Sequence, residues 1–221
     1  MTNNLVYFLD GKAYINITNA CTNRCLFCIR DIKNDVKGTN LWLDLDNVKA
    51  QDVIEQLEEH RSKIKDEITF CGYGEPTLRF DELIKVAKYI KENFENIKIR
   101  INSNGHGSVV NKRNIVKEMI GLVDEISISL NAQNKELYSK ISQPRIENAY
   151  TNMLLFAKDC VDCGIPTTLS VVEGYKDFEI DIDECRKIAN NIGAKLKVRK
   201  WEENGYWYLN IVQNLKTHFI I

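Results

Sequence analysis

The chain has 221 residues, of which 44% are hydrophobic and 28% are charged, and its formal net charge is −1 at pH 7. This length supports one domain with a substantial core, and the near-zero charge gives no electrostatic footprint for nucleic acid or an anionic membrane surface. No run of 18 or more apolar residues occurs, so we expect no membrane span. Seven cysteines without a secretory signal pattern lead us to expect a reducing, cytoplasmic setting in which thiols are free for metals.

Strand-like apolar runs alternate with helical periodicities along the chain, which is typical of a parallel α/β domain. The segment 5–18 predicts two strands joined at Asp10-Gly11, a dipeptide that favours a tight hairpin turn. The second strand, 14–18, is the first of six strand positions in a repeating β/α series. The others are expected at 67–71, 97–103, 124–131, 167–173 and 195–201, with helices near 46–61, 80–94, 111–121, 146–163 and 181–192.

The predicted strands alternate between apolar and polar residues, although parallel strands that are covered on both faces usually read as continuous apolar runs. For example, Ile126 and Ile128 alternate with Ser127 and Ser129. One face of the sheet should therefore meet helices, while the other is polar. Both a sheet with one solvated face and a barrel with a wet interior fit this pattern, and the helix after nearly every strand favours the barrel. In a barrel or in a doubly wound sheet, the chemistry belongs at the carboxyl ends of the strands.

Cationic side chains fall on this polar face. Arg100, Lys197 and Arg199 are expected to line the interior, and the pattern places no carboxylate beside them. Arginine and lysine bind carboxylates and phosphates through charge-assisted hydrogen bonds. We therefore predict an anionic substrate, with Arg145 as a further candidate contact.

Three cysteines lie within eight residues, at Cys21, Cys25 and Cys28, directly after the first repeating strand. They cannot form a closed set of disulfides, and a closed tetrahedral metal site takes four ligands. Three thiolates can hold a four-iron four-sulfur ([4Fe-4S]) cluster and leave one iron open to a small molecule, because such clusters normally take four cysteines. A zinc knuckle that lacks its fourth ligand, or a chance grouping of cysteines, stays open as an alternative.

The second repeating strand is followed by Gly72-Tyr73-Gly74-Glu75-Pro76. Glycine removes the Cβ atom, so the main chain of such a bend can approach a ligand closely. Small amides and hydroxyls then end the next two strands, and such side chains both donate and accept hydrogen bonds. These residues are Asn102, Asn104, Ser127, Ser129 and Asn131.

The C-x3-C-x2-C spacing, with Phe27 before the last cysteine, resembles the cluster loop of the radical S-adenosylmethionine (SAM) enzymes. The segment 72–76 resembles the family's Gly-Gly-Glu-Pro motif, with Tyr73 in the second position. The resemblance implies a partial (β/α)6 barrel of the TIM type, a [4Fe-4S] cluster on the three cysteines, and SAM bound at the open iron. It also implies reduction by a flavodoxin-type or ferredoxin-type electron donor. The implied SAM contacts are Phe27, Gly72, Tyr73, Gly74, Glu75, Asn102, Asn104, Ser127, Ser129, Asn131 and Val172.

More narrowly, the stretch 5–201 resembles the radical SAM proteins associated with TatD-type hydrolases. The supporting segments are the hairpin before the cysteines, 28–31, 70–76, 100–107 and 127–132. This resemblance implies a radical SAM core at 1–203 without an added substrate domain, and a functional link to a TatD-type hydrolase. It supplies no reaction, and the tail at 204–221 departs from the pattern.

Two further side chains are candidates for catalysis. Cys71 ends a strand in register with the polar face, and we interpret it either as a core residue or as substrate-facing. His106 follows another strand, where it is either a solvated turn residue or a proton-transfer group, since its unperturbed pKa suits that task. Cys160 and Cys185 fall on the apolar stripes of their helices, where free cysteine behaves as a small hydrophobe. A second cluster on Cys160 and Cys163 is therefore not expected.

The sequence thus predicts a radical SAM enzyme that abstracts hydrogen from an unidentified, anionic substrate. A second hypothesis is an activase that places a radical on a partner protein. A third is non-enzymatic, either an iron-sulfur electron carrier or a zinc-binding module that uses the same three thiolates. The substrate, small molecule or protein, is left open.

Overall fold

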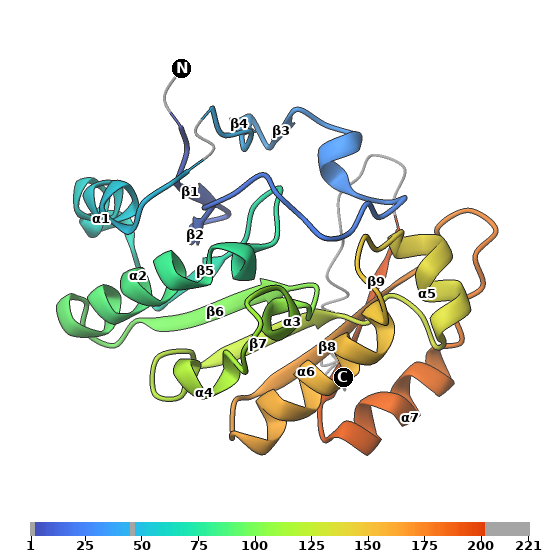
Figure 1. Cartoon of the computed structure of the whole chain (residues 1–221). Helices are drawn as coiled ribbons and strands as arrows, with labels where there is room; N and C mark the ends of the chain where they lie inside the picture. Colours follow the sequence, from blue (N-terminus) through green and yellow to red (C-terminus); the bar gives the residue numbers. More distant parts are fainter. Residues whose placement is uncertain (1–2, 45–46, 202–221) are drawn as a thin grey trace, which may run out of the picture.

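A seven-stranded sheet organises the part of the chain that the computed structural model describes, residues 3–44 and 47–201 (Figure 1). The sheet begins with the antiparallel hairpin of β1 (Val6–Leu9) and β2 (Lys12–Ile15). Five more strands continue from β2 in parallel and in sequence order. They are β5 (Glu67–Phe70), β6 (Lys98–Ser103), β7 (Glu125–Ser129), β8 (Thr167–Glu173) and β9 (Lys195–Lys200). The predicted hairpin and six parallel strands are confirmed.

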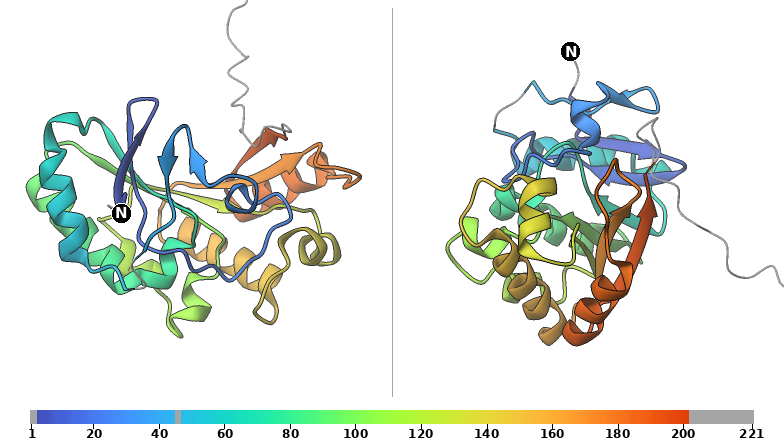
Figure 2. Two further views of the ribbon diagram at one scale, coloured as in Figure 1. Left: turned by 90° about the horizontal axis from the view of Figure 1, so that it is seen from above. Right: turned by 90° about the vertical axis from the view of Figure 1, so that its right-hand side faces the viewer.

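Every crossover between neighbouring parallel strands carries at least one helix, and the longer helices cover one face of the curved sheet (Figures 1 and 2). β1 and β9 are the two edges of the sheet, so the architecture is an open, partial barrel. The predicted boundary between a core at 1–203 and a tail at 204–221 lies outside the described residues. The helices are α1 (Ala50–Glu59), α2 (Phe80–Asn93), α3 (Gly107–Val110), α4 (Val116–Met119), α5 (Lys135–Ser142), α6 (Ala149–Asp162) and α7 (Ile182–Ile192).

The apolar face of the sheet forms the main core. Ile15, Phe70, Ile101 and Ile126 lie side by side in register across four strands, and each is 0% exposed. Burying one such side chain contributes roughly 1.5–3 kcal/mol, so this row is a major source of stability. Because side chains alternate along a strand, the residues between them, such as Ser127, face the opposite side. The alternation in the sequence therefore identified the two faces correctly.

The structure differs from the prediction at three places. The helix expected at 111–121 is wrong, because Lys112 has a left-handed backbone (φ 52°) and separates α3 from α4. Asn114 then accepts a hydrogen bond from the backbone N–H of Val116, which starts α4. The sequence analysis also missed α5 and a small hairpin of β3 (Asp35–Val36) and β4 (Thr39–Asn40).

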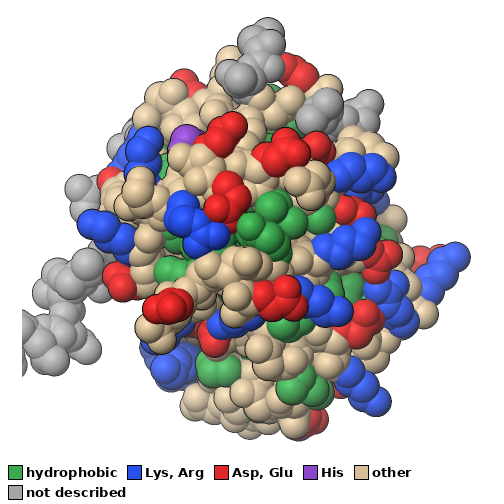
Figure 3. Space-filling model, turned by 90° about the vertical axis from the view of Figure 1, so that its left-hand side faces the viewer, with side chains coloured by type: hydrophobic (Ala, Val, Ile, Leu, Met, Phe, Trp, Pro, Cys, Tyr) green, Lys and Arg blue, Asp and Glu red, His purple; other side chains and the backbone are tan. Residues whose placement is uncertain are grey.

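The surface carries mixed charge. On the side of the molecule where α1 and α2 lie, acidic and basic side chains are interspersed around small apolar areas (Figure 3). Pairs such as Arg61 with Glu58 and Lys85 with Glu82 bring opposite charges together on the helix surfaces. Within residues 3–44 and 47–201, none of the helices is long and apolar enough to cross a bilayer.

Candidate cofactor site

A cavity of about 220 Å³ lies at the carboxyl ends of the parallel strands, where the cysteine loop covers the polar face of the sheet. The loop contributes its three cysteines and Phe27, and the segment after β5 contributes the Gly-Tyr-Gly-Glu motif. The polar strand residues complete the wall. The lining residues include Cys21, Cys25, Phe27, Cys28, Cys71, Gly72, Tyr73, Gly74, Glu75, Asn102, Ser103, Asn104, Ser127, Ser129, Ser170 and Arg199.

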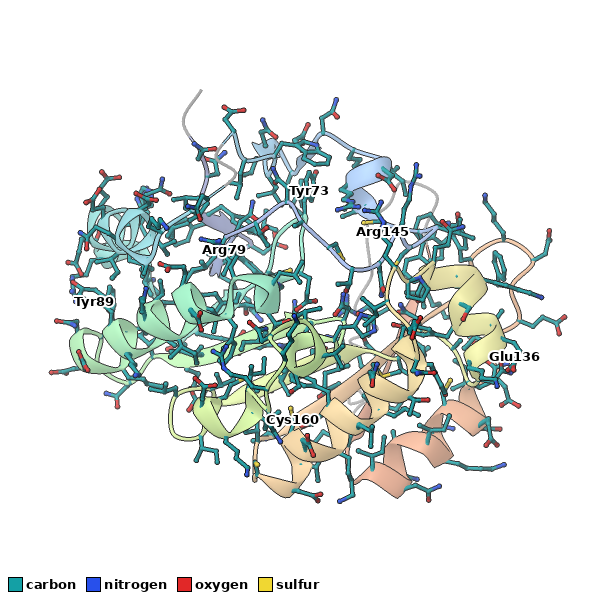
Figure 4. All side chains as sticks on the ribbon, in the orientation of Figure 1. Tyr73, Arg79, Tyr89, Glu136, Arg145 and Cys160 are labelled. Carbon is teal, nitrogen blue, oxygen red and sulfur yellow. The ribbon has the colours of Figure 1, made fainter. Side chains whose placement is uncertain are left out.

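The cysteine loop is fixed by main-chain hydrogen bonds to the segment that ends α5. The N–H of Leu26 donates to the carbonyl of Ile141 (2.9 Å), and the N–H of Arg24 donates to that of Ser142 (3.0 Å). The N–H of Arg145 in turn donates to the carbonyl of Thr22 (2.8 Å). Arg145 lies beside the loop in Figure 4. The end of α5, a helix that was not predicted from the sequence, therefore holds the cysteine loop in place.

All three loop cysteines are free thiols. Burial is the main reason why the pKa of Cys21 is raised to about 11 and that of Cys25 to about 12; the charge of Glu75 contributes at Cys21, and the neighbouring thiolates contribute at Cys25. Burial also raises the pKa of Cys28. Three thiolates gathered beside one cavity are therefore unfavourable on their own, and a positively charged metal centre removes that penalty, since ligation requires deprotonated sulfur.

The two glycines of the motif are required by the chain that crosses over them. A Cβ atom at Gly72 would lie 2.0 Å from Asn16 Oδ1, and one at Gly74 would lie 2.3 Å from the carbonyl oxygen of Thr18. The segment after β2 therefore passes directly over the motif on its way to the cysteine loop. The glycines were predicted to admit a ligand to the main chain. In the structure, the direction that a side chain would take is filled by protein.

Glu75 is buried (3% exposed) and its carboxylate accepts four hydrogen bonds from the protein. Oε1 accepts from the backbone N–H and the hydroxyl of Thr77 and from the hydroxyl of Ser103. Oε2 accepts from the backbone N–H of Asn104 at 2.6 Å. Burial raises the pKa of Glu75, and these donors oppose the rise. The carboxylate thus joins the loops after β5 and β6.

Tyr73 joins the motif to the segment that follows the cysteines. Its hydroxyl donates to the carbonyl of Lys33 (2.8 Å), and its own carbonyl accepts from the Arg30 guanidinium (3.3 Å). Its ring meets Trp42 edge-on, with the ring centroids 5.2 Å apart. Tyr73, labelled in Figure 4, therefore connects two walls of the cavity.

The predicted strand-end contacts fall into two groups. Asn102 and Ser129 line the cavity, and the buried Oδ1 atom of Asn102 has no hydrogen-bond partner among the described residues. Asn131 instead donates to the Ser142 hydroxyl (2.9 Å), behind the loop. Val172 is buried and packs in a small apolar cluster with Phe27. Neither Asn131 nor Val172 is among the lining residues of the described chain.

The two catalytic candidates are placed differently. Cys71 lines the cavity, and burial raises its pKa, so it is a protonated thiol near neutral pH. His106 is 0% exposed and lies behind the loop, between Thr22 at Nδ1 (2.9 Å) and the Tyr138 hydroxyl at Nε2 (3.2 Å). Burial lowers the pKa of His106 to about 4. Its position does not bring it to a substrate in the cavity.

Comparison with known proteins shows which family has this cysteine loop and glycine motif. A family model described as the radical SAM superfamily matches residues 15–189, which include the cysteine loop and the glycine motif. The chain belongs to the radical SAM superfamily. An uncharacterised protein of Methanocaldococcus jannaschii is 27% identical over 242 residues, which cover 91% of this chain and 80% of that protein.

Several solved structures share the fold. SuiB of Streptococcus suis, bound to its precursor peptide SuiA, matches with a TM-score of 0.65 at 18% identity, over 86% of this chain and 39% of SuiB. A radical SAM methyltransferase from Sphaerobacter thermophilus matches with a TM-score of 0.58 at 14% identity, over 90% of this chain and 69% of that one. The chain therefore spans about two fifths of the length of SuiB.

The cofactors of radical SAM proteins are a [4Fe-4S] cluster and SAM. The site has the donors that this pair requires. Three thiols beside one cavity match a cluster with one open iron, and the unpartnered Oδ1 atom of Asn102 is an acceptor for the hydrogen-bond donors of SAM. The residues present therefore fit both groups.

Of the four cations predicted for the substrate, the structure brings only Arg199 to this radical SAM cavity. Arg100 lies 3.7 Å from the carboxylate of Glu125 on the same face of the sheet. Burial lowers the pKa of Lys197 to about 8, with further contributions from Arg199 and Arg100. Arg145 is exposed on the outside of the loop. The expectation of a polar face without carboxylates is wrong, because Glu125 and Glu75 both lie on it.

Several residues at the site were not predicted from the sequence. They include Thr22, which belongs to the cysteine loop, and Tyr138 and Ser142, which lie behind it. The signal that could have found Tyr138 and Ser142 is the start of α5, where the Asn134 side chain caps the helix by accepting from the N–H of Leu137. Cys160 and Cys185 are fully buried in the main core, as expected.

Proposed function

We propose that this radical SAM protein cleaves SAM reductively and abstracts a hydrogen atom from a substrate in the same cavity. The observation that carries the proposal is the convergence of three thiols and the polar residues of four strands, β6 to β9, on one cavity. When bound, the cluster and SAM supply the one-electron cleavage that yields a 5′-deoxyadenosyl radical. The protein contributes binding, orientation and shielding from water.

In this proposal each part of the cavity wall has its own task. Cys21, Cys25 and Cys28 hold the cluster, and Asn102 and Ser129 hydrogen-bond SAM. Five other lining residues keep their predicted role as SAM contacts: Phe27, Gly72, Tyr73, Gly74 and Ser127. Glu75, Asn104, Asn131 and Val172 act one step further out, since their contacts join the segments that form the wall.

Arg199 supports an anionic substrate. It lines the cavity and interacts electrostatically with Cys71, and arginine binds carboxylates and phosphates bidentately. Cys71 lines the same cavity and interacts with Arg199, so it is the remaining candidate for a catalytic side chain. We infer that Arg100, Lys197 and Arg145 do not contact the substrate directly.

The test is SAM cleavage by the anaerobically reconstituted chain under strong reductant, with 5′-deoxyadenosine as the product to be measured. We expect cleavage in the wild type and in Cys163→Ala, which changes a cysteine outside the cavity, and none in Cys25→Ala. Equal cleavage by Cys25→Ala and the wild type would overturn the proposal. Iron and sulfide analysis of the same samples distinguishes an enzyme or an electron carrier from a zinc-binding module.

A protein or peptide substrate is the second candidate, and it corresponds to the activase hypothesis. It is supported by the match to SuiB, a protein whose structure contains a bound precursor peptide. We further propose a flavodoxin-type or ferredoxin-type electron donor for this chain. The narrower resemblance to proteins associated with TatD-type hydrolases gains no support from the matches above and stays a prediction.

A further inference from the structure

Two buried hydroxyls, that of Thr22 within the cysteine loop and that of Ser142 behind it, each receive a hydrogen bond from an asparagine that follows a strand. Asn104 Nδ2 donates to Thr22 Oγ1 at 2.7 Å, and Asn131 Nδ2 donates to Ser142 Oγ at 2.9 Å. Asn104 and Asn131 follow the neighbouring strands β6 and β7. Ser142 is 0% exposed, and the two asparagines are 6% and 3% exposed. The pairs thus repeat one arrangement at adjacent strand ends.

Both pairs reach a thiolate of the loop. An amide group has two N–H bonds, and Asn104 Nδ2 directs one toward Thr22 and lies 3.7 Å from Cys21 Sγ. Ser142 lies beside Cys25, since its carbonyl accepts from the N–H of the preceding Arg24 (3.0 Å). The Ser142 hydroxyl accepts from Asn131, so its own proton is available to the Cys25 sulfur, with which its side chain interacts. One donor from a buried side chain is therefore directed at each of these two sulfurs.

The network behind the donors is closed by aromatic residues. His106 Nδ1 lies 2.9 Å from Thr22 Oγ1, and since that oxygen accepts from Asn104, the Thr22 proton is free to point at the ring nitrogen. The other ring nitrogen meets the Tyr138 hydroxyl, which also accepts from Asn23 Nδ2 at 3.3 Å. Because these groups are buried, their geometry is set by one another rather than by water.

Hydrogen bonds to cluster sulfurs stabilise the more negative, reduced form and so raise the reduction potential. We propose that Asn104 and Ser142 are positioning residues that donate to the Cys21 and Cys25 thiolates and thereby set the reduction potential of the cluster. Asn131 orients Ser142, while Thr22 and His106 orient Asn104. The inference rests on the proposed function, since it requires a cluster on these cysteines.

The test is an anaerobic reductive titration of the reconstituted full chain, followed by electron paramagnetic resonance, with iron content measured on each sample. In Ser142→Ala and in Asn104→Leu we expect a midpoint potential that is more negative than that of the wild type. Ser142→Thr keeps the hydroxyl and should restore the wild-type value. Ser139→Ala, on the exposed face of α5, is the matched control and should leave the potential unchanged.

The outcomes separate the two proposals. Loaded Ser142→Ala and Asn104→Leu chains with the wild-type potential would overturn the inference and leave the proposed function intact. A wild-type chain that binds no iron and sulfide would overturn the proposed function itself. If Ser142→Ala does not fold, Asn104→Leu decides alone. A shift in Ser142→Ala that Ser142→Thr does not reverse would also count against the hydroxyl as its cause.

Discussion

Glu75 offers the sharpest test of how the cavity wall is built. In Glu75→Gln, the shape of the side chain is kept, but one carboxylate oxygen becomes an NH2 group. The least disruptive orientation keeps Oε1 with Thr77 and Ser103 and turns the NH2 group toward the backbone N–H of Asn104, where two donors then face each other. The remaining bonds also lose the strength that the negative charge gives them.

The cost follows from these four contacts. Leaving one buried donor unsatisfied costs about 1–3 kcal/mol, and the weakening of the charged hydrogen bonds adds to it, so we expect the free energy of unfolding to fall by about 2–4 kcal/mol. Urea unfolding of the full chain without cofactors measures this directly, through the transition midpoint at constant slope. Glu59→Gln, which changes an exposed glutamate of α1, is the control and should change nothing measurable. A Glu75→Gln chain as stable as that control would refute the idea that Glu75 joins the loops after β5 and β6.

Three further predictions follow from the site. Gly74→Ala should lower stability and the yield of folded chain, because its Cβ would lie 2.3 Å from the carbonyl oxygen of Thr18. The backbone of Gly74 is not left-handed, so the clash is the only cost expected there, and a Gly74→Ala chain as stable as the wild type would contradict it. Burial holds the pKa of His106 at about 4, below its unfolded value of 6.5, so its contribution to stability is full above pH 6.5 and is lost as the pH falls toward 4. Between pH 7 and pH 4, the free energy of unfolding should decrease less in His106→Gln than in the wild type. An identical decrease in the two proteins would argue against the buried neutral ring. Arg199→Ala should weaken binding of an anionic substrate by about tenfold or more, while the formation of 5′-deoxyadenosine without substrate persists. Arg145→Ala should leave both substrate binding and this basal formation unchanged. Equal substrate binding by the two variants would remove Arg199 from the substrate site.

The parts of the fold that depend on local pattern could be predicted from the sequence. The alternation of Ile126 and Ile128 with serines gave both the strand and its two faces, because the period of a strand is fixed by backbone geometry. The helix at 111–121 failed for a local reason as well, since the left-handed Lys112 ends α3, and nothing in the apolar spacing marks that turn. α5 was missed because it is short and because its end is held by main-chain hydrogen bonds to the cysteine loop, more than a hundred residues earlier.

The chemistry of the site was predictable only as far as the motifs reach. The spacing of the three cysteines allowed a [4Fe-4S] cluster but left a zinc site open, and the cluster was predicted from the resemblance to the radical SAM cluster loop. The task of Glu75 could not be inferred in the same way, because its four donors come from segments that meet only in the folded chain. The same holds for Asn131, which ends a strand as expected but turns toward Ser142 rather than toward the cavity.

The measurement that tests the central claim most directly is the electron paramagnetic resonance spectrum of the reduced, reconstituted chain, recorded with and without SAM. If Cys21, Cys25 and Cys28 hold a [4Fe-4S] cluster with one open iron, the chain carries about four irons and the spectrum changes when SAM binds at that iron. A chain that binds zinc in place of iron, or a cluster whose spectrum is indifferent to SAM, would contradict the account.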